Sequence, residues 1–233
     1  MTVKHTQAVA CLKCGKESPF DFYASINTLQ DPKLKQRVKN FDLFKFICPH
    51  CGSEQFVGYS FLYHQMEDRW MIFCCQEAEE VAEVRTLFDK DDFSTVTDSH
   101  GVKQTIDTAA YQRRIVVGVD DLVEKIRMID AGLDDRLMEV YKVMLYGQMQ
   151  PQLEAMPGGD AVDVLYLDEN LQGALNIVFM ADGQAVGEVP FAREAYESIQ
   201  NSYEKAVKRL ADGEVVIDQD WAFEFLAKVA QGA

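Results

Sequence analysis

The sequence contains no hydrophobic run that approaches the roughly 18–20 residues of a membrane-spanning helix. Residues 1–10 include no apolar segment followed by a small-residue cleavage site, so we expect a cytoplasmic protein without a secretory signal. Basic residues are also scarce, because 23 Lys and Arg stand against 38 Asp and Glu, for a formal charge of −15. This balance argues against a membrane-bound protein and against a general binder of nucleic acids.

Signatures of the common enzyme active sites are missing as well. The sequence has no Walker-type loop, no G-x-S-x-G, no dinucleotide fingerprint and no H-E-x-x-H. Asp134, Asp135 and Glu139 could assemble a carboxylate-based hydrolase, but the two aspartates stand at a helix start, where acidic residues cap the helix. Glu139 and Lys142 have the i,i+3 spacing of a surface pair. We therefore predict a binding protein rather than an enzyme.

Hydrophobic residues make up 48% of the 233 residues, which is enough for a folded core. Residues 151–160 combine two prolines with a Gly-Gly pair and form the best linker candidate. We predict one domain over residues 1–150, β-rich to about residue 75 and helical after 119, and an acidic domain over residues 161–233. Residues 1–52 carry eight basic and four acidic side chains, whereas residues 160–233 carry five and fourteen. The two domains are therefore expected to face different partners.

Segments rich in β-branched and aromatic residues predict strands, and amphipathic segments predict helices. The expected strands are residues 41–47, 55–63, 69–75, 114–118, 162–167, 174–180, 185–189 and 214–217. The expected helices are residues 32–40, 76–92, 120–132, one that starts at 134, 191–210 and 218–230, with a loop or hairpin over 93–110. The fold class is α+β: an amino-terminal zinc-ribbon-like β module with a helical hairpin, then a small α+β domain.

All six cysteines lie in the first third of the chain, and four of them form two copies of C-x-x-C-G. Two thiolates three residues apart can reach one ion from a tight turn, and the glycine permits the positive φ that turns backbone N–H groups toward the sulfurs. Two such knuckles complete a tetrahedral site of four sulfurs, which suits zinc or a single iron. The predicted ligands are Cys11, Cys14, Cys48 and Cys51.

Other uses of cysteine fit this pattern less well. A disulfide framework needs an oxidising compartment, and a thioredoxin-like redox pair needs only one C-x-x-C at a helix start. Cys74 and Cys75 are neighbours on a predicted strand, so their side chains point to opposite faces. We expect one of them to pack as a small apolar residue.

Basic residues close to the cysteines give a second interpretation, in which this face binds nucleic acid. The candidate phosphate contacts are Lys13, Lys16, Lys33, Lys35, Arg37 and Lys39. Alternating basic residues on a helix point to different faces, which counts against a continuous surface. Twelve of the 25 aromatic residues lie between Phe20 and Phe73, and we expect them to pack a sheet rather than to stack on bases.

The second knuckle, Cys48-Pro49-His50-Cys51-Gly52, has the form C-P-x-C, and the apolar segment Leu43–Ile47 precedes it. The first knuckle has Leu12 where a proline would complete the same motif. With Ser25-Ile26-Asn27 and Gly132-Leu133-Asp134-Asp135-Arg136, these segments resemble the CpXC domain family over roughly residues 8–148. The resemblance implies a metal site formed by the four cysteines and implies no reaction.

The paired knuckles are also similar to those of rubredoxin, a one-iron electron carrier. Here the chain continues for some 180 residues past the second knuckle, and a basic helix is predicted between the two knuckles, so we favour zinc over iron. We predict a zinc-stabilised interaction protein that binds a protein partner. The alternatives are a rubredoxin-like redox protein and a nucleic-acid binder.

Overall fold

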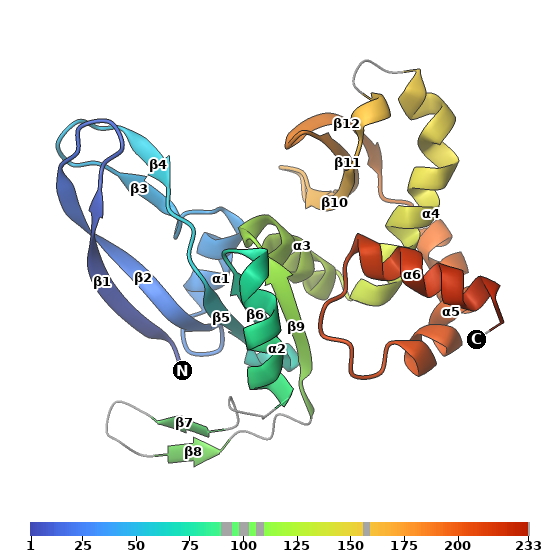
Figure 1. The fold of residues 1–233 in the computed structure, drawn as a ribbon, viewed down its shortest axis with the longest axis horizontal. Helices are drawn as coiled ribbons and strands as arrows, with labels where there is room; N and C mark the ends of the chain where they lie inside the picture. The colour runs from blue at the N-terminus through green and yellow to red at the C-terminus, as the bar shows by residue number, and fades with distance from the viewer. Residues whose placement is uncertain (90–94, 98–102, 106–109, 156–158, 233) are drawn as a thin grey trace. The chain divides into compact units, whose positions relative to one another are not determined.

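The computed structural model describes residues 1–89, 95–97, 103–105, 110–155 and 159–232. The chain divides into two compact units, Met1–Val123 and Glu124–Ala233. Figure 1 shows helices and strands in both units, which confirms the α+β class. The boundary between the units lies before the predicted linker, and residues 151–154 of that linker continue a helix.

The first unit is built on a five-stranded sheet with the order β1-β2-β5-β6-β9 (Figure 1). The pairs β1–β2 and β5–β6 are antiparallel, whereas β2–β5 and β6–β9 are parallel. Its strands are β1 (Val3–Ala10), β2 (Glu17–Asn27), β5 (Phe61–Gln65), β6 (Trp70–Cys75) and β9 (Gln112–Val117). The central strands β5 and β6 are largely buried, as aromatic and β-branched side chains require.

Shorter elements connect these strands. The helices are α1 (Pro32–Lys39), α2 (Val81–Asp89) and the start of α3 (Val119–Asp130). The short hairpins are β3 (Lys45–Ile47) with β4 (Glu54–Phe56), and β7 (Thr95–Thr97) with β8 (Lys103–Thr105). Helix α1 begins with Pro32 at its first turn and buries Leu34 and Val38, which agrees with the sequence prediction. Within the predicted segment 93–110, residues 93–94, 98–102 and 106–109 lie outside the described residues.

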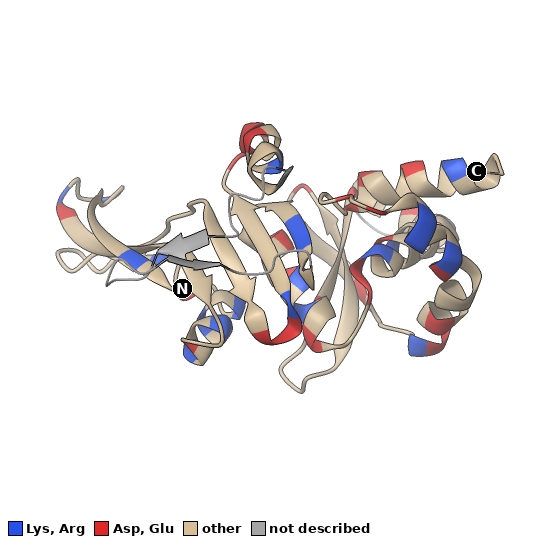
Figure 2. Ribbon diagram, turned by 90° about the horizontal axis from the view of Figure 1, so that it is seen from below, with Lys and Arg blue, Asp and Glu red and all other residues tan. Residues whose placement is uncertain are grey.

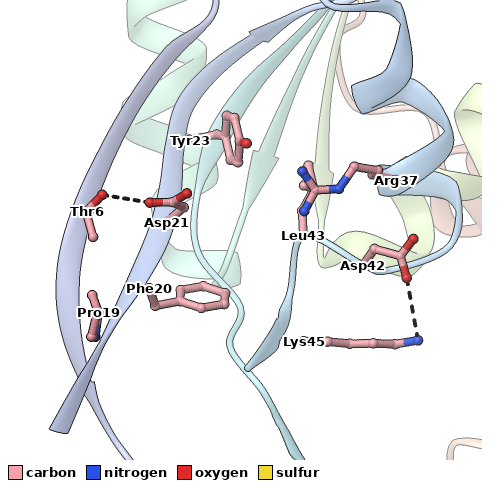
Figure 3. A pocket seen from close by; sticks show the side chains of 9 residues that line it. All are labelled: Thr6, Pro19, Phe20, Asp21, Tyr23, Arg37, Asp42, Leu43 and Lys45. Carbon is pink, nitrogen blue, oxygen red and sulfur yellow. Dashed lines mark hydrogen bonds and ion pairs between the residues drawn. The ribbon is translucent and has the colours of Figure 1, made fainter. Parts of the chain in front are cut away.

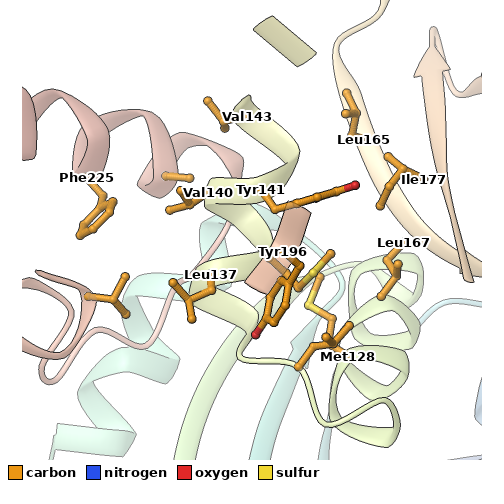
Figure 4. Close-up of a cluster of buried hydrophobic side chains, with 14 of the residues drawn as sticks. Met128, Leu137, Val140, Tyr141, Val143, Leu165, Leu167, Ile177, Tyr196 and Phe225 are labelled. Atoms are coloured by element: carbon orange, nitrogen blue, oxygen red, sulfur yellow. The ribbon is translucent and has the colours of Figure 1, made fainter. Parts of the chain in front are cut away.

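The second unit packs helices on a three-stranded antiparallel sheet with the order β10-β11-β12. Its elements are α4 (Asp135–Glu154), β10 (Val164–Glu169), β11 (Leu175–Ala181), β12 (Gln184–Pro190), α5 (Arg193–Leu210) and α6 (Gln219–Ala230). Figure 4 shows the core of this unit, where Tyr141 of α4 points toward Ile177 of the sheet. Met128 of α3 belongs to the same core, which explains why the unit begins inside α3.

Several sequence predictions differ from the structure. Of the predicted strand 41–47 only Lys45–Ile47 is a strand, because residues 41–44 form a turn in which the Phe44 N–H donates to the Phe41 carbonyl. Strands β1 and β2 were not predicted, although they are the longest pair of the first sheet. The segment 55–63 is divided between β4, which ends at Phe56 and pairs with β3, and β5, which starts at Phe61 and belongs to the five-stranded sheet. Residues 214–217 form no strand, since the carbonyl of Ile217 accepts a hydrogen bond from Lys125 Nζ over 2.6 Å instead.

Candidate metal centre

Each C-x-x-C-G knuckle closes a β-hairpin. The first connects β1 to β2 directly after the pair Ala10–Glu17, and the second connects β3 to β4 directly after the pair Ile47–Glu54. Four backbone hydrogen bonds repeat between the two turns: Cys11 N to Lys16 O, Gly15 N to Cys11 O, Cys48 N to Ser53 O and Gly52 N to Cys48 O, all 2.8–3.0 Å. Gly15 and Gly52 have φ of 71° and 70°, the left-handed conformation that favours glycine.

The two hairpins bring the four predicted ligands together. One Sγ atom from each of Cys11, Cys14, Cys48 and Cys51 lies within 4.8 Å of all the others. Two of these distances cross between the knuckles, 3.6 Å from Cys11 to Cys51 and 3.7 Å from Cys14 to Cys48. A regular tetrahedron of sulfurs around zinc at about 2.3 Å has edges of about 3.8 Å. The arrangement therefore suits a single metal ion with four thiolate ligands.

The two cysteines of each knuckle differ in burial. The first of each pair, Cys11 and Cys48, is buried, and together with Phe46 they form a small apolar cluster against Val9, Phe20 and Val57. The second of each pair, Cys14 and Cys51, is exposed. The site is therefore fixed to the protein on one side and open to an entering ion on the other.

Ser53 lies beside two of the sulfurs. Its Oγ is 3.1 Å from Cys11 Sγ and 3.1 Å from Cys51 Sγ. Hydrogen bonds, first with Ser53 and then with backbone groups of Cys14 and Lys13, lower the pKa of Cys11 to about 6, and the bond with Ser53 also lowers the pKa of Cys51. The Lys16 N–H lowers the pKa of Cys14, but burial and the neighbouring thiols outweigh it and raise that pKa to about 11. A bound cation would stabilise all four groups as thiolates.

Gln55 of β4 holds the first knuckle from the other hairpin. Its Oε1 accepts a hydrogen bond from the Leu12 N–H over 2.8 Å, and its Nε2 donates to the Ala10 carbonyl over 3.2 Å. A proline at position 12 would have no N–H to donate, so Leu12 provides a contact that the C-P-x-C form excludes. Neither Ser53 nor Gln55 was predicted from the sequence, where the only signal is a run of three polar residues, Ser53 to Gln55, after the second knuckle.

Replacing Ser53 by alanine should weaken zinc binding in a pH-dependent way. Without the hydroxyl, the pKa of Cys11 rises from about 6 toward the ordinary thiol value, so protons compete with zinc more strongly. We expect an affinity loss of about 10- to 100-fold near neutral pH that shrinks as the pH rises toward 9. Competition with a chromophoric chelator between pH 6 and 9 measures it, with Ser202→Ala on the exposed face of α5 as the control. A loss that is constant with pH would contradict this role.

The basic residues of the nucleic-acid interpretation fall into two groups. Lys13 and Lys16 are exposed at the first knuckle, whereas the other four lie on α1. Figure 2 shows basic residues on α1 and separate ones at the outer end of the β1–β2 hairpin. On α1, Lys33 and Arg37 are exposed and Lys35 and Lys39 are half-buried, so the helix does not present them on one face. Nucleic-acid binding by these residues stays a prediction.

The carboxylates that suggested a hydrolase are engaged with lysines. Asp135 and Glu139 are 1% and 2% exposed, and Lys125 Nζ lies 3.5 Å and 3.0 Å from their carboxylates. The expectation that Glu139 and Lys142 form a surface pair is wrong, because Lys142 is only 4% exposed. Asp134 does cap α4, as predicted, by accepting a hydrogen bond from the Arg136 N–H.

Cys74 and Cys75 lie apart from the cluster of four cysteines. Both are buried on β6, where burial raises the pKa of Cys74, and raises that of Cys75 to about 11. Cys74 Sγ lies 3.3 Å from the Gly118 carbonyl, which accepts its hydrogen bond. Both therefore pack as small apolar residues, whereas the sequence predicted this for only one of them.

Comparison with known proteins identifies the family. The family described as CpXC protein matches residues 9–142, a range that contains all four clustered cysteines. Comparisons with curated proteins and with solved structures found no match. None of the described helices has both the length and the hydropathy needed to cross a bilayer. Because the family match covers more than half of the chain, the chain belongs to the CpXC family.

Proposed function

We propose that this protein is a zinc-stabilised interaction module in which the metal joins the two knuckle-bearing hairpins. The observation that carries the proposal is the convergence of four sulfurs from two hairpins within 4.8 Å. Hairpin β3–β4 has only three residues per strand, and the buried cluster behind the site consists of Cys11, Phe46 and Cys48. Two-stranded hairpins of this size are marginally stable alone, and a structural zinc ion supplies folding free energy directly.

Purified protein should contain one zinc per chain and show no thiolate-to-iron absorption in the visible range. Elemental analysis with an absorption spectrum measures both, and one iron with a red colour would instead support the rubredoxin-like alternative.

After removal of zinc by a chelator, amide hydrogen exchange should accelerate in the two knuckle hairpins and stay unchanged in β10–β12 of the second unit. If the exchange rates of the two knuckle hairpins are the same before and after chelation, the metal does not stabilise them.

We propose that the second unit binds a protein partner with a basic surface. Residues 124–233 carry nine Lys and Arg against twenty Asp and Glu. Leu171 and Phe223 add apolar side chains that are 102% and 46% exposed. An acidic unit with exposed apolar side chains favours a basic partner that buries these side chains on binding.

A partner captured on the full-length protein should be released as the salt concentration rises. The matched variants are Leu171→Ser in the second unit and Leu12→Ser in the first unit. Leu12 is 86% exposed. We expect Leu171→Ser to weaken capture and Leu12→Ser to leave it unchanged. Capture that depends on Leu12 alone would assign the partner to the knuckle end of the first unit instead.

A further inference from the structure

A pocket of about 360 Å³ lies on the first unit, away from the four cysteines (Figure 3). One wall is formed by β1 and β2, and the opposite wall by the end of α1 and the segment that leads into β3. Its volume falls in the range of small-molecule sites, about 300–1,000 Å³. Because Arg37, Asp21, Asp42 and Lys45 all line it, its charge pattern decides what it can hold.

Each carboxylate of the pocket already has a cation. Asp21 accepts hydrogen bonds from Thr6 Oγ1 over 2.6 Å and from Lys4 Nζ over 2.9 Å, and these bonds lower its pKa. Asp42 forms an ion pair with Lys45 at 3.9 Å. With Asp21 and Asp42 neutralised in this way, Arg37 leaves the pocket with one net positive charge.

Because both carboxylates of the pocket are already paired, Arg37 is the charged group of the pocket that can bind a ligand. Figure 3 shows its side chain directed into the pocket from α1, across from Tyr23. Among the described residues, its guanidinium forms no hydrogen bond and no ion pair. A guanidinium presents parallel N–H donors that match a carboxylate or phosphate, so an oxyanion is its natural partner.

The rest of the lining is apolar and held in place by packing. Leu43 and Tyr23 are 2% and 7% exposed. The ring of Phe20 packs edge-on against Phe22 and Phe46, with ring centres 5.1 and 5.9 Å apart, and Pro19 lies beside it on β2. Such walls bury an apolar body without first having to be ordered.

We propose that this pocket binds a small molecule with an oxyanionic head and a flat apolar body. The carboxylate or phosphate head pairs with Arg37, and the body lies against Phe20, Pro19 and Leu43. This site uses none of the four cysteines, so it stands independently of the metal proposed above.

The site can be tested by titrating the metal-loaded, full-length protein with benzoate, phenyl phosphate and neutral benzamide. Binding is measured from the changes in backbone amide NMR shifts. We expect benzoate or phenyl phosphate to shift residues of β2 and 42–45, and benzamide to bind at least about tenfold more weakly. The stronger of the two anions identifies the head group as carboxylate or phosphate.

Arg37→Gln should reduce anion binding at least about tenfold. Arg37→Lys should retain part of the anion binding, since lysine keeps the positive charge but lacks the parallel N–H donors of the guanidinium. Lys33→Gln, exposed one turn earlier on α1, serves as the matched control and should bind like the parent. Because Arg37 is exposed and unpaired, its variants should keep the parent spectrum elsewhere. Binding unaffected by Arg37→Gln, equal binding of benzamide, or no binding of either anion would each overturn the proposal.

Discussion

Replacing Cys48 by serine should abolish stoichiometric zinc binding and unfold the knuckle end of the first unit. Cys48 is 1% exposed and lies with Cys11 and Phe46 in the small cluster behind the sulfurs. Serine cannot provide a thiolate, and the three remaining sulfurs leave the tetrahedral site incomplete. Structural zinc contributes about 10–16 kcal/mol of apparent binding free energy, as much as the whole stability of a typical domain. Replacing one of these four ligands is therefore expected to cause one of the largest losses of any single substitution in this chain.

The measurement is zinc content after gel filtration, combined with amide hydrogen exchange. We expect less than about 0.1 zinc per chain and rapid exchange in both knuckle hairpins, with protection retained in β10–β12. Cys75→Ala is the matched control, because Cys75 is equally buried on β6 but lies outside the cluster of four. A Cys48→Ser protein that keeps one zinc and full protection would show that this thiol is not a ligand.

The four cysteines could be predicted from spacing alone because the chemistry of the knuckle is local. Six residues from Cys48 to Ser53 contain the turn, the glycine with positive φ and both sulfurs. The contacts of Ser53 and Gln55 could not be predicted in the same way. Both act on Cys11 or Leu12, which lie about forty residues earlier, so they depend on how the two hairpins meet.

The helices followed their sequence periodicity, whereas the missed strand β1 had little of it. Residues 3–10 form β1 at the edge of the sheet, and seven of these eight residues are exposed. A strand without a buried face shows no alternation of apolar and polar residues, so its pattern resembles that of a loop. The predicted strand 214–217 was apolar enough, but the hydrogen bond from Lys125 takes the place of a ladder partner.

The buried charges of the second unit were the feature least accessible from the sequence. Glu124 and Lys125 of α3, and Asp135, Glu139 and Lys142 of α4, are all at most 4% exposed. Glu124 also accepts the N–H of Leu167 on β10, while Lys125 reaches the Ile217 carbonyl. Spacing along one helix indicates which charges can pair, but the backbone partners of Glu124 and Lys125 come from 43 and 92 residues away.

Replacing Lys142 by methionine should lower the free energy of unfolding of the second unit by about 3–5 kcal/mol. Lys142 Nζ lies 2.9 Å from Glu124 Oε1 and 2.9 Å from Glu139 Oε2. Burial lowers its pKa, but Glu124 and Glu139 more than offset burial and raise that pKa, so the lysine is charged. Methionine fills similar space and leaves the two carboxylates buried without this partner. Denaturant unfolding at pH 7 measures the change.

Lys208→Met on α5 provides the matched control for the lost ion pair. Lys208 pairs with Glu204 at 2.6 Å, but the two side chains are 66% and 45% exposed, so the change should stay within about 0.5 kcal/mol. Adding Glu124→Gln to Lys142→Met should recover part of the loss, because the amide can still accept the Leu167 N–H without burying a charge. Equal losses for Lys142→Met and Lys208→Met would contradict a buried network.

The loss of unfolding free energy in Lys142→Met should also depend on pH, and the pKa of Glu124 determines the direction of this dependence. Burial raises the pKa of Glu124, and Lys142 opposes that rise, so removal of the lysine raises the pKa further. A carboxyl group with a folded-state pKa above its unfolded value favours folding below the unfolded value and loses that contribution as the pH rises. The difference between Lys142→Met and the parent should therefore shrink as the pH falls from 7 toward about 4.5. A difference that stays constant over this range would mean that the variant loses packing rather than charge compensation.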